Sequence, residues 1–435
     1  MKASETKGSS DLGDAGTLAA AGDVLSGRSK RGGLARLLPF LGPAFIASVA
    51  YIDPGNYATN IAAGSQFGYI LLWVIVASNL MAILIQSLSA KLGIASGLNL
   101  AEQCRTQLPR PVVLAMWVIM ELVAMATDLA EFLGAALGFN LLLGIPLWVA
   151  GILTAIATFL ILGLERHGFR PLEAVIAAMV GVVAVSYLVE TILDQPAWNQ
   201  VVYHAFVPQF AGSESVLLAV GILGATVMPH AIYLHSALTQ GRIVVREPRT
   251  LRRLFHFELV DVLIAMGLAS LINMAMLIMA ASTFHVQGMT TVATIQDAYK
   301  TLEPLLGRAA SAIFAISLLA SGLSSSSVGT MAGQVIMQGF LKRHIAPWIR
   351  RLVTMAPSLV VISIGLDPTR TLVISQVLLS FGLPFAVIPL VMFTRRRDIM
   401  GVLVNGRITT ILASGVAALI VLLNAYLLYA LILAR

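Results

Sequence analysis

Long apolar stretches alternate with short polar segments along most of this chain. Most stretches have about 20 residues or more, the length at which an α-helix crosses a hydrocarbon core of roughly 30 Å. The pattern predicts an all-α, multi-pass membrane protein with eleven spanning helices, over residues 38–64, 67–95, 110–139, 146–164, 171–192, 214–240, 255–285, 305–337, 351–366, 370–394 and 407–432.

The first 36 residues differ from this pattern. They are rich in Gly, Ser, Ala and charge and show no periodic apolar face, which predicts a flexible tail at 1–36 before a transmembrane domain at 37–435. The basic end of the tail resembles the start of a signal peptide, but the apolar stretch after it is too long for one. We expect the tail to be retained.

Composition agrees with a membrane protein. Charged residues make up 11 % of the 435 positions, against roughly 25 % in an ordinary globular chain, and hydrophobic residues make up 58 %. So little charge cannot cover a soluble surface, which excludes a soluble enzyme, a disordered scaffold and a nucleic-acid reader. The single cysteine, Cys104, allows no internal disulfide and no cysteine-based metal cage.

The basic residues predict the orientation of the chain. If the N-terminus is cytoplasmic, all but four of the 28 Lys and Arg residues lie on the cytoplasmic side; the exceptions are Lys300, Arg308, Arg370 and Arg435. Positive residues favour the cytoplasmic side, so we expect the C-terminus outside. The net charge of +7 then follows from topology and needs no nucleic acid.

Two prolines indicate an internal repeat. Pro54 and Pro229 interrupt the first and sixth predicted helices, 175 residues apart. Paired interruptions in corresponding helices are typical of transporters built from two inverted repeats, with the binding site between them. We therefore expect five-helix halves at 38–192 and 214–394, followed by an eleventh helix at 407–432.

The first interruption reads Asp53-Pro54-Gly55-Asn56. A carboxylate at bilayer depth costs about 2.5–3.5 kcal/mol, so it needs a partner or a function. Because proline removes an N–H group and disfavours helical geometry in the residue before it, we expect an unwound segment that faces a cavity. The alternative is a simple kink in which Asp53 caps the second half-helix.

The second interruption supplies further ligands. Pro229 should free the carbonyl of Ala225, and Met228 lies directly before the proline. Facing the first interruption, the ligands would be the Asp53 carboxylate, the Asn56 amide oxygen, the Ala225 carbonyl and the Met228 sulfur. Three hard oxygens and one soft thioether suit Mn²⁺ or Fe²⁺ better than Mg²⁺ or Ca²⁺. Core packing is the ordinary alternative for Met228.

Three motifs carry a resemblance to a known family: Asp53–Asn56, Met228–His230 followed by Leu234-His235-Ser236, and Ala332–Phe340. With these three motifs in this order, the chain resembles the Nramp family of proton-coupled divalent metal transporters, and especially its bacterial manganese branch. The resemblance implies a LeuT-like fold, with metal ligands at Asp53, Asn56, Ala225 and Met228. It also implies that Gln376 approaches the metal in some states. Ala231 departs from the Asn that many members carry.

Three acids lie on the third predicted helix. At about 100° per residue, Glu121 and Asp128 nearly eclipse and Glu131 lies about 60° away, so the three share one face. Acids on one face of a membrane helix are typical of a polar pathway. The resemblance matches them to the proton route of the family and implies pairing with Arg350 and Arg351. A structural ion-pair network is the alternative.

Two histidines follow the second interruption. His230 is a candidate to buffer a proton near the metal, because imidazole titrates near physiological pH. His235 is better interpreted as a core histidine with satisfied partners.

These observations predict a secondary importer of Mn²⁺ and Fe²⁺, with proton symport by alternating access, in the inner membrane of a bacterial cell. The chain has no P-loop, so ATP drive is not expected. We expect no enzymatic activity, no cofactor beyond the transported ion and no obligate protein partner. One rival is a LeuT-like transporter of amino acids or organic cations, in which Asp53 binds an ammonium group. An intramembrane hydrolase would need a nucleophile–base pair or a metal motif, and neither is evident.

Overall fold

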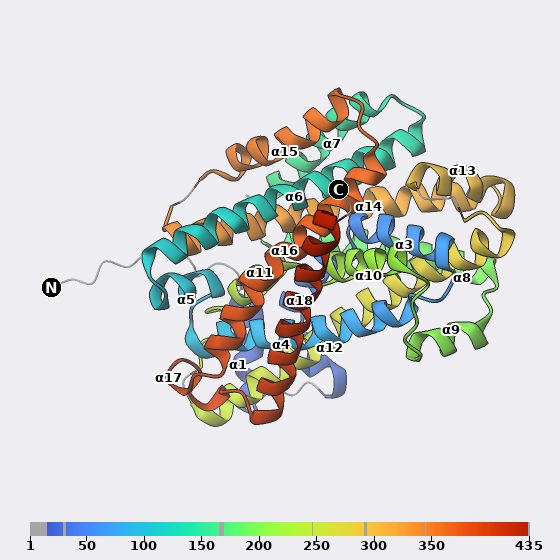
Figure 1. Cartoon of the computed structure of the whole chain (residues 1–435). Coiled ribbons are helices and arrows are strands. Elements are labelled where there is room, and N and C mark those ends of the chain that lie inside the picture. The colour runs from blue at the N-terminus through green and yellow to red at the C-terminus, as the bar shows by residue number, and fades with distance from the viewer. Residues whose placement is uncertain are drawn as a thin grey trace.

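The computed structural model describes residues 15–28, 32–164, 169–245, 247–290, 294–343 and 345–433, and in these ranges it contains helices and no β-strand. Its α-helices are α1 (Ala15–Leu25), α2 (Pro43–Val49), α3 (Pro54–Phe67), α4 (Leu72–Ser96), α5 (Leu100–Gln107), α6 (Arg110–Leu143), α7 (Leu147–Gly163), α8 (Phe169–Asp194), α9 (Trp198–Phe206), α10 (Ser213–Thr226), α11 (Pro229–Thr239), α12 (Pro248–Thr283), α13 (Ile295–Leu306), α14 (Arg308–Leu341), α15 (Pro347–Ser363), α16 (Pro368–Thr394), α17 (Arg397–Met400) and α18 (Arg407–Leu433). Short 3₁₀ turns are η1 (Gly33–Arg36), η2 (Ala50–Ile52), η4 (His285–Gln287) and η5 (Gly401–Leu403). Figure 1 shows these helices gathered into one bundle.

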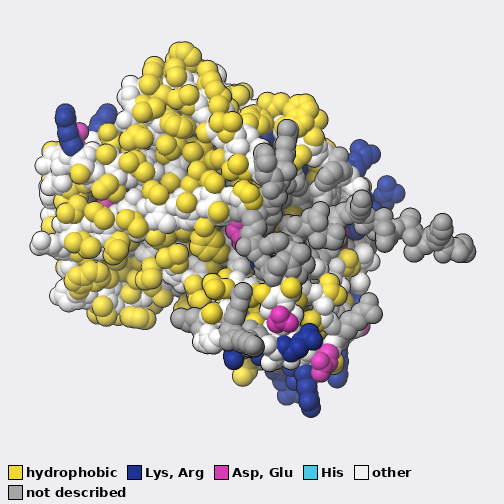
Figure 2. Space-filling model, turned by 180° about the vertical axis from the view of Figure 1, so that it is seen from behind, with side chains coloured by type: hydrophobic (Ala, Val, Ile, Leu, Met, Phe, Trp, Pro, Cys, Tyr) yellow, Lys and Arg dark blue, Asp and Glu magenta, His cyan; other side chains and the backbone are white. Residues whose placement is uncertain are grey.

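The prediction of an all-α, multi-pass membrane protein is confirmed. Within the described ranges, eight helical segments are long and apolar enough to cross a membrane, and Pro43–Ile52 and Leu147–Gly163 are shorter apolar helices. Large hydrophobic side chains are exposed on the outside of the bundle, and Figure 2 shows a broad hydrophobic face with Lys and Arg at its edges. A surface of this kind suits contact with lipid. The count of eleven spans stays a prediction.

The N-terminal segment differs from the predicted flexible tail over residues 15–25. Here α1 buries Ala21, Val24 and Leu25 against Phe40 and Leu254. The spacing of three and then one residue places the three side chains on one helical face. The sequence interpretation overlooked this face because alanine and glycine together make up more than half of the helix. Residues 1–14 and 29–31 of the predicted tail lie outside the described residues.

Both predicted helix interruptions are confirmed. Asp53 is extended (φ −82°, ψ 166°) between η2 and α3, and Met228 is extended (φ −81°, ψ 117°) between α10 and α11. Each second half-helix begins at its proline, Pro54 or Pro229, because proline fits the first turn of a helix, where its missing N–H has no partner to lose.

Small residues allow the helices around the interruptions to approach closely. A Cβ added at Gly134 of α6 would come 2.1 Å from the ring of Pro54, and one at Gly138 would come 2.7 Å from Leu319 of α14. Close backbone approach of this kind is the usual basis of helix packing in membranes. It brings the face of α6 that carries the acids next to the start of α3.

Candidate metal site and charged pathway

The two helix interruptions meet through the side chain of Asn56. Its Nδ2 donates to the carbonyl oxygen of Ala225, at 2.9 Å, and to Oδ1 of Asp53, at 2.7 Å. Pro229 lies four residues after Ala225 and has no N–H to occupy that carbonyl, so the oxygen is free to bind across the interface. The structure therefore brings together three of the four residues predicted to bind metal.

Asp53 also caps the helix that follows it. Its Oδ1 accepts from the backbone N–H of Asn56, at 3.0 Å. Asp53 therefore does cap the second half-helix, as the alternative interpretation of the sequence expected, but it uses only one of its carboxylate oxygens to do so. The other oxygen, Oδ2, is buried and has no hydrogen-bond partner in the described part of the chain.

Three buried oxygens around the interruptions lack partners among the residues that the structure describes: Asp53 Oδ2, Asn56 Oδ1 and Gln376 Oε1. An unpaired buried oxygen costs about 1–3 kcal/mol. Carboxylate and amide oxygens of this kind are suitable ligands for a cation. The Nδ2 hydrogens of Asn56 lie between Asp53 and the carbonyl of Ala225, in the position that a bound cation would take. If the amide rotated by 180°, Oδ1 of Asn56 would join the oxygens that face this position. The donor chemistry thus fits a metal ion as transported substrate.

Gln376 lies against both interruptions, and its approach to a metal, which the family resemblance implied, stays a prediction. A Cβ on Gly55 would come 1.9 Å from Nε2 of Gln376, and a Cβ on Gly224 would come 2.5 Å from its backbone oxygen. Helix α16 can cross both interruptions because these two positions have no side chain. Neither glycine stands out in the sequence as a residue with this role.

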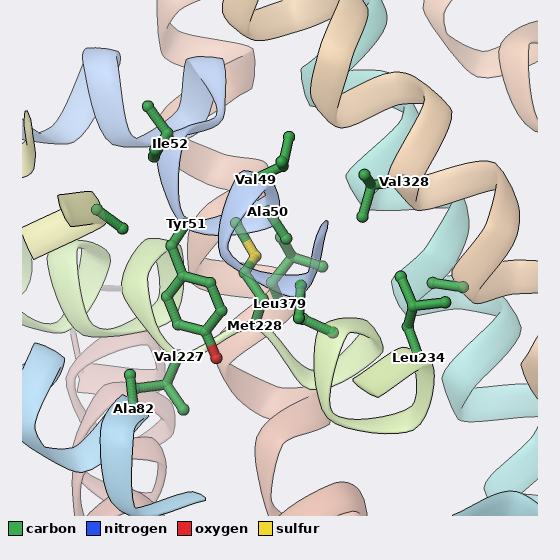
Figure 3. Close-up of a cluster of buried hydrophobic side chains, with 14 of the residues drawn as sticks. Val49, Ala50, Tyr51, Ile52, Ala82, Val227, Met228, Leu234, Val328 and Leu379 are labelled. Carbon is green, nitrogen blue, oxygen red and sulfur yellow. The ribbon is translucent and has the colours of Figure 1, made fainter. Parts of the chain in front are cut away.

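Met228 is fully buried at the second interruption. Figure 3 shows it within a cluster of buried apolar side chains that includes Ala50 and Leu379. In this arrangement its sulfur lies in apolar surroundings, so a bond from Met228 to a metal stays a prediction.

Two of the three acids on α6 form ion pairs with the predicted arginines. Arg350 donates to both carboxylate oxygens of Glu121, at 3.1 and 2.7 Å. Arg351 donates to Asp128 at 2.8 Å and also to Ser326 of α14. Arg350, Arg351 and Asp128 are buried. The pairing implied by the resemblance is therefore present in the structure.

Glu131 is different, because neither of its carboxylate oxygens has a hydrogen-bond partner in the described ranges. The side chain is fully buried against Gly329, where an added Cβ would lie 2.5 Å from Oε2. Gly134, one turn further along α6, contacts Pro54. Glu131 therefore lies between the Asp128–Arg351 pair and the first interruption.

The two histidines of α11 have different surroundings. His235 has partners at both ring nitrogens: Gln86 Oε1 lies 2.9 Å from Nδ1, and Glu258 Oε1 lies 3.2 Å from Nε2. Its interpretation as a satisfied core histidine is confirmed. His230 has Thr127 3.3 Å from Nδ1, whereas its Nε2 has no partner among the described residues.

Sequence reasoning missed several polar residues beside the site. Asn273 donates to the backbone oxygen of Tyr51 at 2.7 Å and accepts from Asn60 at 3.0 Å. Gln86 donates to the Tyr51 hydroxyl at 2.6 Å. The available signal was an amide side chain inside an apolar run, which is the same signal that singled out Asn56.

Two interrupted helices that meet at a buried cluster of oxygens, inside an apolar helical bundle, define a membrane transporter with a LeuT-like fold. The same fold occurs in a nucleobase-cation symporter, Mhp1, at a TM-score of 0.61 and 15 % identity, covering 83 % of this chain and 81 % of that one.

Residues 44–430 match the model of the family described as natural resistance-associated macrophage protein-like, and the chain belongs to this Nramp family. It is 56 % identical over 414 residues to a divalent metal cation transporter MntH of Deinococcus radiodurans, covering 95 % of each chain. It is 53 % identical over 405 residues to the MntH of Bacillus subtilis, covering 93 % of this chain and 95 % of the relative. A crystal structure of the Eremococcus coleocola manganese transporter, bound to an aromatic bis-isothiourea compound, matches with a TM-score of 0.83 and 36 % identity, covering 91 % of this chain and 87 % of that one.

Proposed function

We propose that this chain is a secondary active importer of divalent transition metal ions, Mn²⁺ and also Fe²⁺, coupled to proton symport by alternating access in a bacterial inner membrane. The observation that carries the proposal is the Asn56 side chain, which joins Asp53 to the carbonyl of Ala225 across the two helix interruptions. The names of the relatives, divalent metal cation transporter and manganese transporter, support the same substrate class.

The proposed ligands are Asp53, Asn56, Ala225 and Met228, with Gln376 joining in some states. Asp53 supplies the one full negative charge of this set, so a bound dication keeps a net positive charge. Such partial neutralisation favours release as well as binding. The Met228 sulfur would favour transition metals over Ca²⁺ and Mg²⁺, which prefer oxygen alone.

The proposed proton route begins at Glu131 and continues through Asp128 and Arg351 to Glu121 and Arg350. A dication at Asp53 repels a proton held on the unpaired Glu131 and so promotes its departure from the site. Glu131 and Glu121 lie ten residues apart on α6, about 15 Å along the axis at 1.5 Å per residue. The acids therefore extend from the site toward the helix end predicted to be cytoplasmic. His230 is the remaining candidate to hold a proton near the metal.

Uptake by the purified chain in liposomes tests this proposal. We expect Mn²⁺ to enter faster when the outside is acidic, and internal pH to fall together with Mn²⁺ entry. Fe²⁺ should compete with Mn²⁺, and amino acids should not. Mn²⁺ uptake without any proton movement would contradict the coupling, and uptake of an amino acid in place of Mn²⁺ would favour the organic-substrate rival.

A further inference from the structure

A second group of buried oxygens lies away from the proposed metal ligands, at the end of α8. Tyr187, Glu190 and Asp194 are spaced by three and four residues and therefore share one face of this helix. Helix α8 packs against α12 and α14. From α3, Tyr57 meets Tyr187 edge-on, with ring centroids 5.5 Å apart. The orientation predicted from the basic residues places this end of α8 outside.

Three of the four carboxylate oxygens in this group lack a partner. In the described part of the chain, no hydrogen bond reaches either carboxylate oxygen of Glu190 or Oδ2 of Asp194. Oδ1 of Asp194 accepts from the hydroxyl of Thr283 at 2.8 Å. Glu190, Tyr57 and Tyr187 are at most 1 % exposed. Three unpartnered carboxylate oxygens in one place are unusual, because buried polar atoms are nearly always satisfied.

The charge of the group is also unbalanced. Glu190 and Asp194 carry two carboxylates, and neither forms an ion pair with a Lys, Arg or His that the structure describes. A buried carboxylate without a counter-charge is costly at membrane depth. Two carboxylates and two hydroxyls are hard oxygen donors, and their combined charge matches a divalent cation.

We propose that Glu190, Asp194, Tyr187 and Tyr57 form a second divalent-cation site, made of oxygen ligands only, on the outer side of the transport site. Its use as an entry station for the transported ion rests on the function proposed above. Asp194 is half-buried at the end of α8, Glu190 lies one turn further in, and Tyr57 adjoins the proposed ligand Asn56 in the sequence. The residues therefore lead from the predicted outer surface toward the helix interruptions.

The two sites should differ in selectivity. The group on α8 has no sulfur, so Ca²⁺ and Mg²⁺ should bind there as readily as Mn²⁺. The transport site, with Met228, should discriminate against Ca²⁺. Calcium therefore serves as a probe that separates the two sites within one protein.

Binding of Mn²⁺ to the purified chain tests the second site. Asp53→Ala should abolish binding of the ion at the proposed transport site. We expect this variant to retain one bound Mn²⁺ at the second site, measured from the electron paramagnetic resonance of free Mn²⁺. Adding Glu190→Gln should weaken that binding at least about tenfold, equivalent to roughly 1.4 kcal/mol. Tyr187→Phe keeps the ring and removes only the hydroxyl, and should weaken it less. Calcium should displace this Mn²⁺.

Glu214→Gln is the matched control, because Glu214 is an exposed acid at the start of α10 on the same predicted side. It should leave Mn²⁺ binding unchanged. Thermal unfolding of each variant shows whether it folds, and Glu190→Gln, which removes an unpaired buried charge, should not unfold at a lower temperature. An Asp53→Ala protein that binds no Mn²⁺, or one whose binding survives Glu190→Gln, overturns the second site. Neither result bears on transport by the unmodified chain, whose failure in liposomes would instead overturn the proposed function.

Discussion

Two buried polar groups lie beside the interrupted helices, and they differ in how completely their atoms are paired. Around Asp53, three oxygens from three residues have no partner among the described residues. Around His235, both ring nitrogens are bound, and Gln86 continues the chain of hydrogen bonds to the Tyr51 hydroxyl at 2.6 Å.

The number of unpaired polar atoms distinguishes a ligand-binding site from a structural hydrogen-bond network. Each unpaired buried polar group costs about 1–3 kcal/mol, so a cluster of them persists where an occupant repays the cost. The paired network connects η2, α4, α11 and α12 without an occupant. It links these helices to one another, whereas the unpaired oxygens of Asp53, Asn56 and Gln376 are available to a cation.

The largest expected effect comes from Asp53→Ala. This change removes the only full charge among the proposed ligands and leaves the Asn56 amide without its nearest acceptor. Removing one partner of a buried charge interaction typically costs about 2–5 kcal/mol, which is roughly 30-fold or more in affinity. Mn²⁺ uptake in liposomes should fall to the background rate. Near-normal uptake by this variant would contradict the site assignment.

Asp128→Asn and Glu131→Gln should separate stability from proton coupling. Asp128→Asn leaves Arg351 buried without its carboxylate, and breaking a buried pair costs roughly 3–5 kcal/mol. Glu131→Gln breaks no ion pair that the structure describes, so its unfolding temperature should stay close to that of the unmodified protein.

Both variants should carry fewer protons per Mn²⁺, because each removes a group of the proposed route. The measurement is internal pH alongside Mn²⁺ flux, with thermal unfolding in parallel. If proton flux persists unchanged in Glu131→Gln, the acids of α6 form a structural network only.

The parts of the site that could be predicted from the sequence have a strong local cause. Proline fixes its own backbone and restricts the residue before it, so Pro54 and Pro229 determine both interruptions. A carboxylate inside an apolar run is energetically costly and therefore indicates a functional residue, which is how Asp53 and the acids of α6 were identified. The ion pairs to Arg350 and Arg351 came from family resemblance, because nothing local links α15 to α6.

What could not be predicted depends on contacts between distant segments. Gly55 and Gly224 look like ordinary flexible positions in the sequence, and only the packing of Gln376 against them shows why a side chain is not tolerated. The helix at 15–25 was overlooked because its short apolar face is recognised only from its contacts with Phe40 and Leu254. The hydrogen bond from Asn56 to Ala225 and the unpaired oxygens nearby likewise depend on how α3 and α10 pack against each other.

A smaller effect, on selectivity, is expected from Met228→Ala. Removing the thioether leaves oxygen ligands and room for water, so Mn²⁺ should still be carried. Cd²⁺ should lose the most affinity, since it gains most from sulfur, and Ca²⁺ or Mg²⁺ should begin to compete. The measurement is Mn²⁺ uptake against titrations of Ca²⁺ and Cd²⁺ for both proteins. Unchanged competition would show that Met228 only packs in its apolar cluster.

The smallest effect on metal transport should come from His235→Leu, which tests the paired side of the comparison. The change leaves Gln86 and Glu258 without their shared partner, so the free energy of unfolding should fall by about 1–3 kcal/mol. Mn²⁺ affinity should change by less than about twofold, because the hydrogen-bond partners of His235 are Gln86 and Glu258 and not the proposed ligands. Combining His235→Leu with Glu258→Leu should recover part of the lost stability, since replacing both partners by apolar groups removes the unpaired atoms. A loss of Mn²⁺ affinity as large as that of Asp53→Ala, with stability unchanged, would place His235 in the binding site and remove the distinction between paired and unpaired clusters.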